Sequence, residues 1–143
     1  MILRYASLFS VSAVLSGCSV GLTPGGNYPT TTFNVDVPYQ EAYRRAEASL
    51  RQCHASSNPL MRAKHINGTL YTDNHTGTIR VTMDGWGNDM ERVEFSESGT
   101  GSTKVAITVW EGAMFDAGEV AAVRRSIETG VPACREPKYN NPI

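Results

Sequence analysis

The chain has 143 residues, of which 41% are hydrophobic and 19% are charged, and its formal net charge is −1. That balance argues against a nucleic-acid-binding protein that relies on electrostatics, because such a domain carries a basic patch or stripe. The length suits one domain with its own core and is too short for two.

The first predicted element is an export signal at residues 1–17. Arg4 supplies a positive start, and an uncharged, mostly apolar run extends from Tyr5 to Leu15. This run is shorter than the about 20 apolar residues that a membrane-spanning helix needs, and small residues follow it, as at a signal-peptidase site. The alternative is a buried N-terminal helix of a cytosolic domain, which leaves the change of composition after Cys18 unexplained.

The residues at the end of this signal resemble a known sorting motif. Leu15-Ser16-Gly17-Cys18 is similar to the bacterial lipobox, in which an aliphatic residue and two small residues precede a cysteine. The resemblance implies that Cys18 carries the lipid attachment and becomes the first residue of the mature lipoprotein. Acyl chains of the palmitate type anchor stably because each buried methylene contributes about 0.8 kcal/mol and more than one chain is attached. Ser19, in place of aspartate, resembles the pattern of Gram-negative lipoproteins sent to the outer membrane, where they face the periplasm.

Residues 18–32 are predicted to form the lipidated N-terminus and a flexible tether. The segment is rich in glycine and proline and has no helical or strand periodicity. Such a composition stays flexible and holds a domain off the membrane surface. The folded domain is then expected at residues 33–135, with a C-terminal tail at residues 136–143.

A strand and a helix are predicted at the start of the domain. Residues 33–37 alternate apolar and polar side chains, as in a half-buried strand, and Pro38 suits the first turn of a following helix. Small and apolar residues then recur at three- and four-residue steps as far as Cys53, which predicts an amphipathic helix. The pair Glu41 and Arg45 is expected on its solvated side.

Four further strands are predicted after an irregular segment that runs from His54 to Gly68 and ends in a turn at Asn67-Gly68. The strand-like segments are Thr69–Asp73, Gly77–Asp84, Glu91–Glu97 and Thr103–Trp110. Apolar and polar positions alternate along them, which predicts an antiparallel sheet with one solvated face. Glu94 and Glu91 are expected on that solvated face.

A final helix is predicted after Asp116. Asp116 and Glu119 have the spacing of a capping box, although aspartate replaces the usual serine or threonine. An apolar stripe follows, and Gly130 ends the helix. The resulting fold class is α+β: a single domain with an antiparallel sheet of about five strands and two amphipathic helices on one face, in the order β-α-β-β-β-β-α.

Two cysteines, Cys53 and Cys134, remain if Cys18 is acylated. In an oxidising compartment an even pair indicates a disulfide, which here would close a loop of about 80 residues and contribute about 4 kcal/mol in the chain-entropy model. The alternatives are two free, buried thiols or a metal site, although two cysteines without closely spaced partners make a poor zinc motif.

A second resemblance covers most of the chain after the signal. The segments "VPYQEAYRRAEASLRQC", "GTLYTDNHTGTIRV", "TKVAITVWEG" and "IETGVPAC" resemble a family of short, uncharacterised proteobacterial outer-membrane lipoproteins. The family signature is a helix closed by a cysteine, a sheet, and a final helix followed by Gly-x-x-x-Cys, which Gly130 and Cys134 match. The resemblance supports the disulfide and the envelope location, and it implies no catalytic residues.

No catalytic or metal-binding motif is visible in the sequence. His54, His65 and His75 form no H-x-x-x-H or H-E-x-x-H pattern, and the residues around His75 are those of a hairpin turn. A G-x-S-x-G elbow is absent, and a bridged cysteine pair offers no nucleophilic thiol. We therefore expect no metal, no cofactor and no enzymatic activity.

One aromatic residue is a candidate for partner binding. Trp86 lies between Gly85 and Gly87 in an expected loop, where a large aromatic side chain is costly to leave in water. Surface aromatics often anchor partners. The alternative is that Trp86 folds over the sheet edge or caps the core.

These features together predict a lipid-anchored, non-catalytic accessory or interaction module of the cell envelope. Lipidation would raise its effective concentration toward an envelope protein partner at the same membrane. The alternative is a ligand-binding or hydrolase-inhibitor module that uses loop residues around Trp86.

Overall fold

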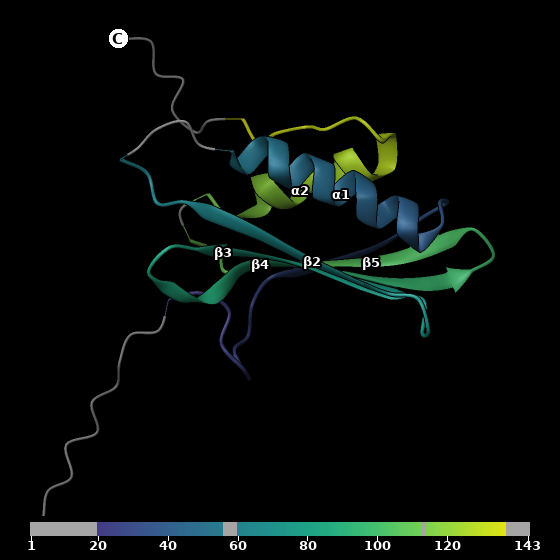
Figure 1. The fold of residues 1–143 in the computed structure, drawn as a ribbon, viewed down its shortest axis with the longest axis horizontal. Coiled ribbons are helices and arrows are strands. Elements are labelled where there is room, and N and C mark those ends of the chain that lie inside the picture. The colour runs from purple at the N-terminus through teal and green to yellow at the C-terminus, as the bar shows by residue number, and fades with distance from the viewer. Residues whose placement is uncertain (1–19, 56–59, 113, 137–143) are drawn as a thin grey trace, which may run out of the picture.

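The computed structural model describes residues 20–55, 60–112 and 114–136. It contains one antiparallel five-stranded sheet in the order β1-β5-β4-β3-β2, with both helices packed on the same face (Figure 1). The elements are β1 (Thr30–Val35), α1 (Tyr39–His54), β2 (Lys64–Tyr71), β3 (Thr76–Met83), β4 (Trp86–Gly99), β5 (Ser102–Val109) and α2 (Ala117–Thr129). The predicted α+β class and the order of elements are confirmed.

The connections explain why the sheet needs a helix across it. Strands β2 to β5 are neighbours both in sequence and in space, whereas β1 pairs with β5 at the opposite edge from β2. The chain must therefore cross the whole sheet between β1 and β2, and α1 makes that crossing. Antiparallel hairpins need only short turns, so the remaining strands follow one another directly.

The core lies between the sheet and the two helices. Apolar side chains face one another across the strand pairs Phe33–Val105, Phe95–Val105 and Ile79–Val93. Leu50 of α1 and Ile127 of α2 are fully buried above them. The period-two alternation predicted from the sequence therefore places one apolar face under the helices and leaves a polar face open.

The start of β2 differs from the prediction. The strand begins at Lys64, and Asn67-Gly68 lies inside it, paired with Arg80 and Ile79, rather than in a turn. Gly68 has another role here: a Cβ at this position would lie 1.9 Å from the Tyr43 hydroxyl. The glycine therefore leaves room for the ring of Tyr43 and does not mark a tight turn.

Part of the predicted tether is packed against the domain. Leu22 is buried, and its backbone N–H donates to the Asp89 carbonyl at 2.7 Å. The Tyr28 hydroxyl accepts from the Thr23 N–H at 2.9 Å and donates to the Gly21 carbonyl at 3.0 Å. Leu22 and the bond from Asn88 Nδ2 to the Val20 carbonyl at 2.9 Å join this segment to the domain, and the Tyr28 hydroxyl closes a turn within it. Residues 30–32 already belong to β1, so the expectation of a flexible tether as far as residue 32 is wrong.

The helix ends show one confirmed cap and one unexpected contact. The Asp116 side chain accepts from the Gly118 and Glu119 N–H groups at 2.9 and 3.3 Å, which confirms the predicted cap. Arg45 pairs with Glu41 at 2.8 Å as predicted, but its Nη1 also donates to the Ile127 carbonyl at 2.9 Å. Arg45 therefore binds the C-terminal end of α2, where a cation is favoured.

Several sequence predictions lie outside the described residues, namely the signal at residues 1–17, Cys18 and the tail from residue 137. In the part of the chain that the structure describes, neither helix has the length and apolar character required to cross a bilayer.

Candidate functional site

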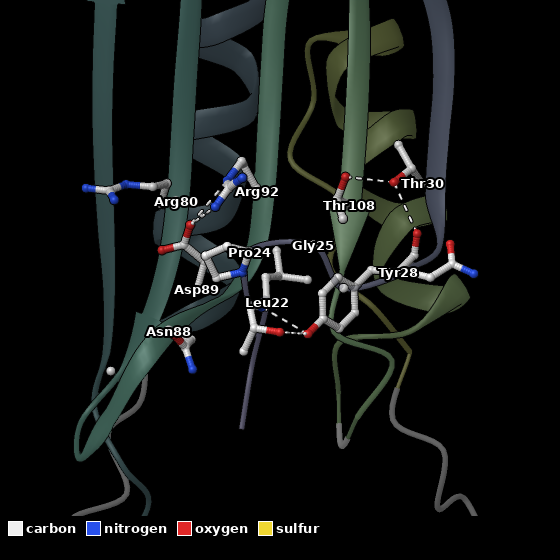
Figure 2. A pocket seen from close by; sticks show the side chains of 14 residues that line it. Leu22, Pro24, Gly25, Tyr28, Thr30, Arg80, Asn88, Asp89, Arg92 and Thr108 are labelled. Carbon is white, nitrogen blue, oxygen red and sulfur yellow. Dashed lines mark hydrogen bonds and ion pairs between the residues drawn. The ribbon is translucent and has the colours of Figure 1, made fainter. Parts of the chain in front are cut away.

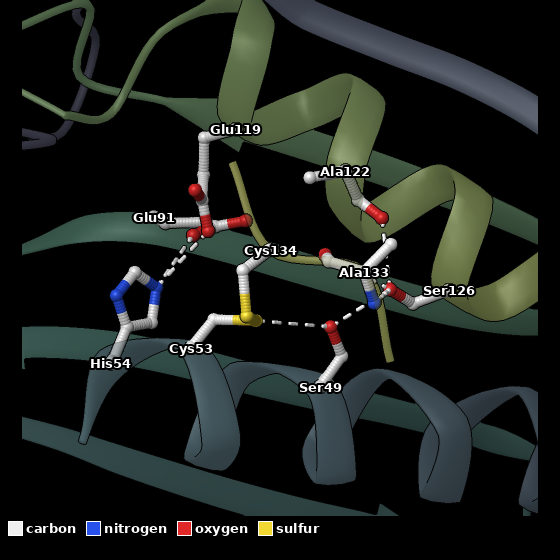
Figure 3. The surroundings of a disulfide bond; sticks show 9 residues. All are labelled: Ser49, Cys53, His54, Glu91, Glu119, Ala122, Ser126, Ala133 and Cys134. Carbon is white, nitrogen blue, oxygen red and sulfur yellow. Dashed lines mark hydrogen bonds and ion pairs between the residues drawn. A yellow bond between two sulfur atoms is a disulfide. The ribbon is translucent and has the colours of Figure 1, made fainter. Parts of the chain in front are cut away.

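Three buried ionisable side chains meet between the helices and the sheet (Figure 3). His54 is the last residue of α1, Glu91 belongs to β4, and Glu119 lies in the first turn of α2. Their exposed fractions are 4%, 0% and 2%. His54 Nε2 lies 3.1 Å from Glu119 Oε1 and 3.7 Å from Glu91 Oε2. We call these three residues the buried triad.

The position of Glu91 overturns a sequence prediction. Glu91 was expected on the solvated face, but it points into the core because it shares the parity of Val93 and Phe95. Its strand partner is Val109, which also faces inward. A carboxylate therefore occupies a position that the strand pattern reserves for an apolar side chain.

The two helices supply the other members of the buried triad. His54 follows Leu50 by one helical turn on the inward stripe of α1, and its ring lies 5.6 Å from that of Phe115. Glu119 lies close to the capped N-terminus of α2, where the helix dipole favours a negative charge. Sequence reasoning missed these two because the residues lie far apart along the chain and form no local motif.

The buried triad is poorly satisfied by hydrogen bonds. Both ring nitrogens of His54 and both carboxylate oxygens of Glu91 lack a hydrogen-bond partner among the described residues. The 3.1 Å contact of His54 with Glu119 is thus an ion pair without good hydrogen-bond alignment. Unsatisfied buried polar groups cost about 1–3 kcal/mol each, so a cluster of this kind calls for a functional explanation.

Burial and charge shift the pKa values of the buried triad. Burial by itself lowers the pKa of His54, but the contacts with Glu119 and Glu91 outweigh it and raise that pKa to about 9. Burial raises the pKa of Glu91 to about 7, and the charge of Glu119 adds to this, whereas His54 acts in the opposite direction. The metal-free buried triad can therefore hold a proton on His54 near neutral pH, while Glu91 is only partly ionised.

A surface hollow lies beside one member of the triad, His54. This hollow has a volume of about 340 Å³ and is lined in part by His54, Lys64 and His65. Burial lowers the pKa of Lys64, and the charge of Glu119 raises it. Of the three triad residues, the lining of this hollow includes His54 and neither glutamate.

The predicted disulfide is present between Cys53 and Cys134, with an S–S distance of 2.04 Å. Ser49 and Ser126, at the same level of α1 and α2, share a hydrogen bond of 2.8 Å. Ser126 Oγ also accepts from the Ala133 N–H at 2.8 Å. Figure 3 shows that the bridge and these serines bind the segment after α2 to α1, beside the buried triad.

Trp86 is half-buried rather than fully exposed. Its ring lies edge-on to that of Trp110, with centroids 5.7 Å apart, and the Arg62 guanidinium lies 5.6 Å from its centroid. Trp86 also packs against the core cluster. These contacts favour the capping interpretation, and a role in partner binding stays a prediction.

The other two histidines of the chain are exposed and lie apart from the triad. His65 Nε2 contacts Asp84 Oδ1 at 2.6 Å. His75 pairs with Glu97 and stacks on Tyr39 at a centroid distance of 5.6 Å. His75 has a backbone φ of 53°, in keeping with the predicted turn.

The open face of the sheet has a larger hollow of about 670 Å³ (Figure 2). Leu22 and Tyr28 of the N-terminal segment form one wall, and Arg80 and Arg92 lie on the sheet. A second hollow of about 390 Å³ contains the same two arginines. Arg92 is held by Asp89 at 2.7 Å, whereas Arg80 makes no ion pair within the described ranges. We call this surface, centred on Arg80 and Arg92, the open-face groove.

Fold and site together define a small, disulfide-linked α+β domain with a buried His–Glu–Glu triad. No protein-family model matches the chain, and no curated protein matches its sequence.

Proposed function

We propose that the chain is an exported lipoprotein whose folded domain acts as a non-catalytic interaction module of the cell envelope. The observation that carries the proposal is the Cys53–Cys134 disulfide, in a chain whose remaining cysteine stands in a lipobox-like sequence. Disulfides persist in oxidising compartments and are rare in the cytosol. The outer membrane, on its periplasmic side, is the proposed location.

The packed N-terminal segment adds a constraint on distance to this proposal. Cys18 precedes the buried Leu22 by four residues, which span at most about 14 Å when fully extended. An acyl chain on Cys18 would thus hold the domain close to the bilayer rather than at the end of a long tether. Partners at the same membrane would meet it at a high effective concentration.

The open-face groove is the surface that we assign to a protein partner. Both helices cover the opposite face of the sheet, and among the described residues this polar face carries only the N-terminal segment around Leu22 and Tyr28 (Figure 1). Arg80 offers an exposed guanidinium there, and arginine is enriched at interface hot spots.

Fractionation of intact cells tests the anchor. Cys18→Ala is expected to yield a soluble or uncleaved species without acyl label. Ser19→Asp is the matched control, and it should keep the label while shifting toward the inner membrane. Normal membrane retention and acyl labelling of Cys18→Ala would refute the anchor.

Crosslinking in intact cells tests the interaction. The native protein should capture one envelope protein reproducibly. That crosslink should be lost in Arg80→Glu and retained in Lys104→Glu, a charge reversal on the same face but outside both hollows. Equal capture by both variants would contradict the assigned surface.

A further inference from the structure

We propose that the buried triad binds a divalent first-row transition metal ion, for which Zn²⁺ is the probe. Each of His54, Glu91 and Glu119 offers one ligand atom, and these atoms all lie within 4.8 Å of one another. One imidazole nitrogen and two carboxylate oxygens form a donor set that Zn²⁺ accepts, with a fourth position left for water. This inference does not depend on the proposed export or anchoring.

The spacing of the donors is close to that of a bound ion. Zinc bonds of about 2.0–2.2 Å place two ligand atoms at most about 4.4 Å apart. His54 Nε2 and Glu119 Oε1 already lie 3.1 Å apart, and Glu91 Oε2 is 3.7 Å from the same nitrogen. All the ligand atoms lie within 4.8 Å of one another, so the widest separation exceeds the limit for zinc by at most about 0.4 Å.

The burial of the donors supplies an independent reason for a ligand. The carboxylate of Glu91 is fully buried and has no hydrogen-bond partner among the described residues, and it points toward His54 and Glu119 (Figure 3). A metal ion would use the lone pairs of this carboxylate and of His54 Nε2 directly. It would also relieve the repulsion between two carboxylates that share one apolar compartment.

A metal-free ion cluster is the competing explanation. His54 and Lys64 bring positive charge, Glu91 and Glu119 bring negative charge, and Phe115 forms an apolar wall. In the described part of the chain, however, Lys64 forms no ion pair with either glutamate. The cluster thus leaves Glu91 without a direct cationic contact closer than 3.7 Å, which a metal ion would provide.

Zinc binding to the full, disulfide-intact protein tests the proposal after treatment with a chelator. Calorimetric titration with Zn²⁺ should give one ion per chain, and Zn²⁺ should raise the melting temperature. Glu119→Gln and Glu91→Gln keep the side-chain shape and should each weaken binding at least about tenfold, as loss of a ligand requires. His65→Gln is the matched control because His65 lines the same hollow but is exposed.

NMR of the imidazole nitrogens in the native protein tests the same site without any variant, so it does not depend on whether a variant folds. Zn²⁺ should shift the signal of the buried His54 while leaving those of His65 and His75 in place. Absence of stoichiometric binding by the native protein would overturn the proposal. Binding that shifts His65 or His75 and leaves His54 unaffected would overturn it equally.

Discussion

His54 at the end of α1 lies 3.1 Å from Glu119 in the first turn of α2, and both side chains are almost completely buried. The contact joins two helices that four consecutive strands, β2 to β5, separate in the sequence. Because an ion pair in the interior loses its hydration, its members depend on each other much more than those of a surface pair.

Removal of one partner should therefore be costly. Glu119→Gln should lower the free energy of unfolding of the metal-free protein by about 3 kcal/mol at neutral pH, because it leaves the charge of His54 buried and uncompensated. Glu128→Gln is the matched control, since Glu128 makes an exposed pair with Arg124 on the same helix. Its cost should be below about 1 kcal/mol. Urea denaturation of both variants makes the comparison, and equal effects would contradict it.

The stability of the metal-free protein should fall as the pH rises through the neutral range. The pKa of His54 is raised from 6.5 to about 9 in the folded state. Its contribution is thus fully present below pH 6.5 and lost as the pH passes about 9. The pKa of Glu91 is raised from 4.5 to about 7, so the folded state binds its proton more tightly and stability also falls as the pH rises from about 4.5 to about 7.

Urea denaturation at a series of pH values in the presence of a chelator measures this slope. His54→Gln should flatten the plot of unfolding free energy against pH between pH 6.5 and about 9. The raised pKa of His54 corresponds to a loss on the order of 3 kcal/mol across that range. Glu91→Gln should flatten the same plot between pH 4.5 and about 7. The exposed control His65→Gln should leave the profile unchanged, and a native profile that rises with pH would disprove the assignment.

Reduction of the disulfide should destabilise the domain by about 4 kcal/mol, because the bridge closes a loop of 81 residues in the unfolded chain. Urea denaturation with and without reductant measures the difference. The double variant Cys53→Ser, Cys134→Ser should lose as much in the absence of reductant, and reductant should then have no further effect. Non-reducing peptide mapping should recover Cys53 joined to Cys134, and its failure would refute the bridge in the native protein.

Leu22 should behave as a core residue although it lies before the first strand. Leu22→Ala should lower the free energy of unfolding by about 2 kcal/mol, because it removes a buried side chain that packs beside β4. Asn27→Ala, an exposed position in the same segment, should be nearly neutral. Thermal denaturation measures both variants. Equal melting temperatures would contradict the prediction and indicate that the segment is a flexible tether.

Local pattern was sufficient for most of the secondary structure. The three- and four-residue spacing of α1 and the Asp116 cap of α2 were visible because each depends on residues within one or two turns. The start of β2 was not predictable from the sequence. Its pairing with β3 and the closeness of Gly68 to Tyr43 involve residues far apart along the chain. The contact of Arg45 with α2 is not predictable from local spacing for the same reason, since its partner carbonyl belongs to the other helix.

The buried triad could not be predicted from the sequence. Glu91 has the parity of Val93 and Phe95, so the pattern contained its direction, but a charged residue does not normally mark an inward position. His54 and Glu119 have no motif in common. Only the packing of α1 and α2 on one sheet brings the three side chains within 4.8 Å of one another.

The sequence by itself determined the class of fold and the order of its elements, because hydrophobic period and turn chemistry are local properties. The cysteine pair was indicated by the even number of cysteines that remain after Cys18. Tertiary structure alone decided that the N-terminal segment packs on the domain and that a histidine meets two glutamates in the core. Contacts between distant residues depend on how whole elements pack, and one-dimensional spacing does not record that packing.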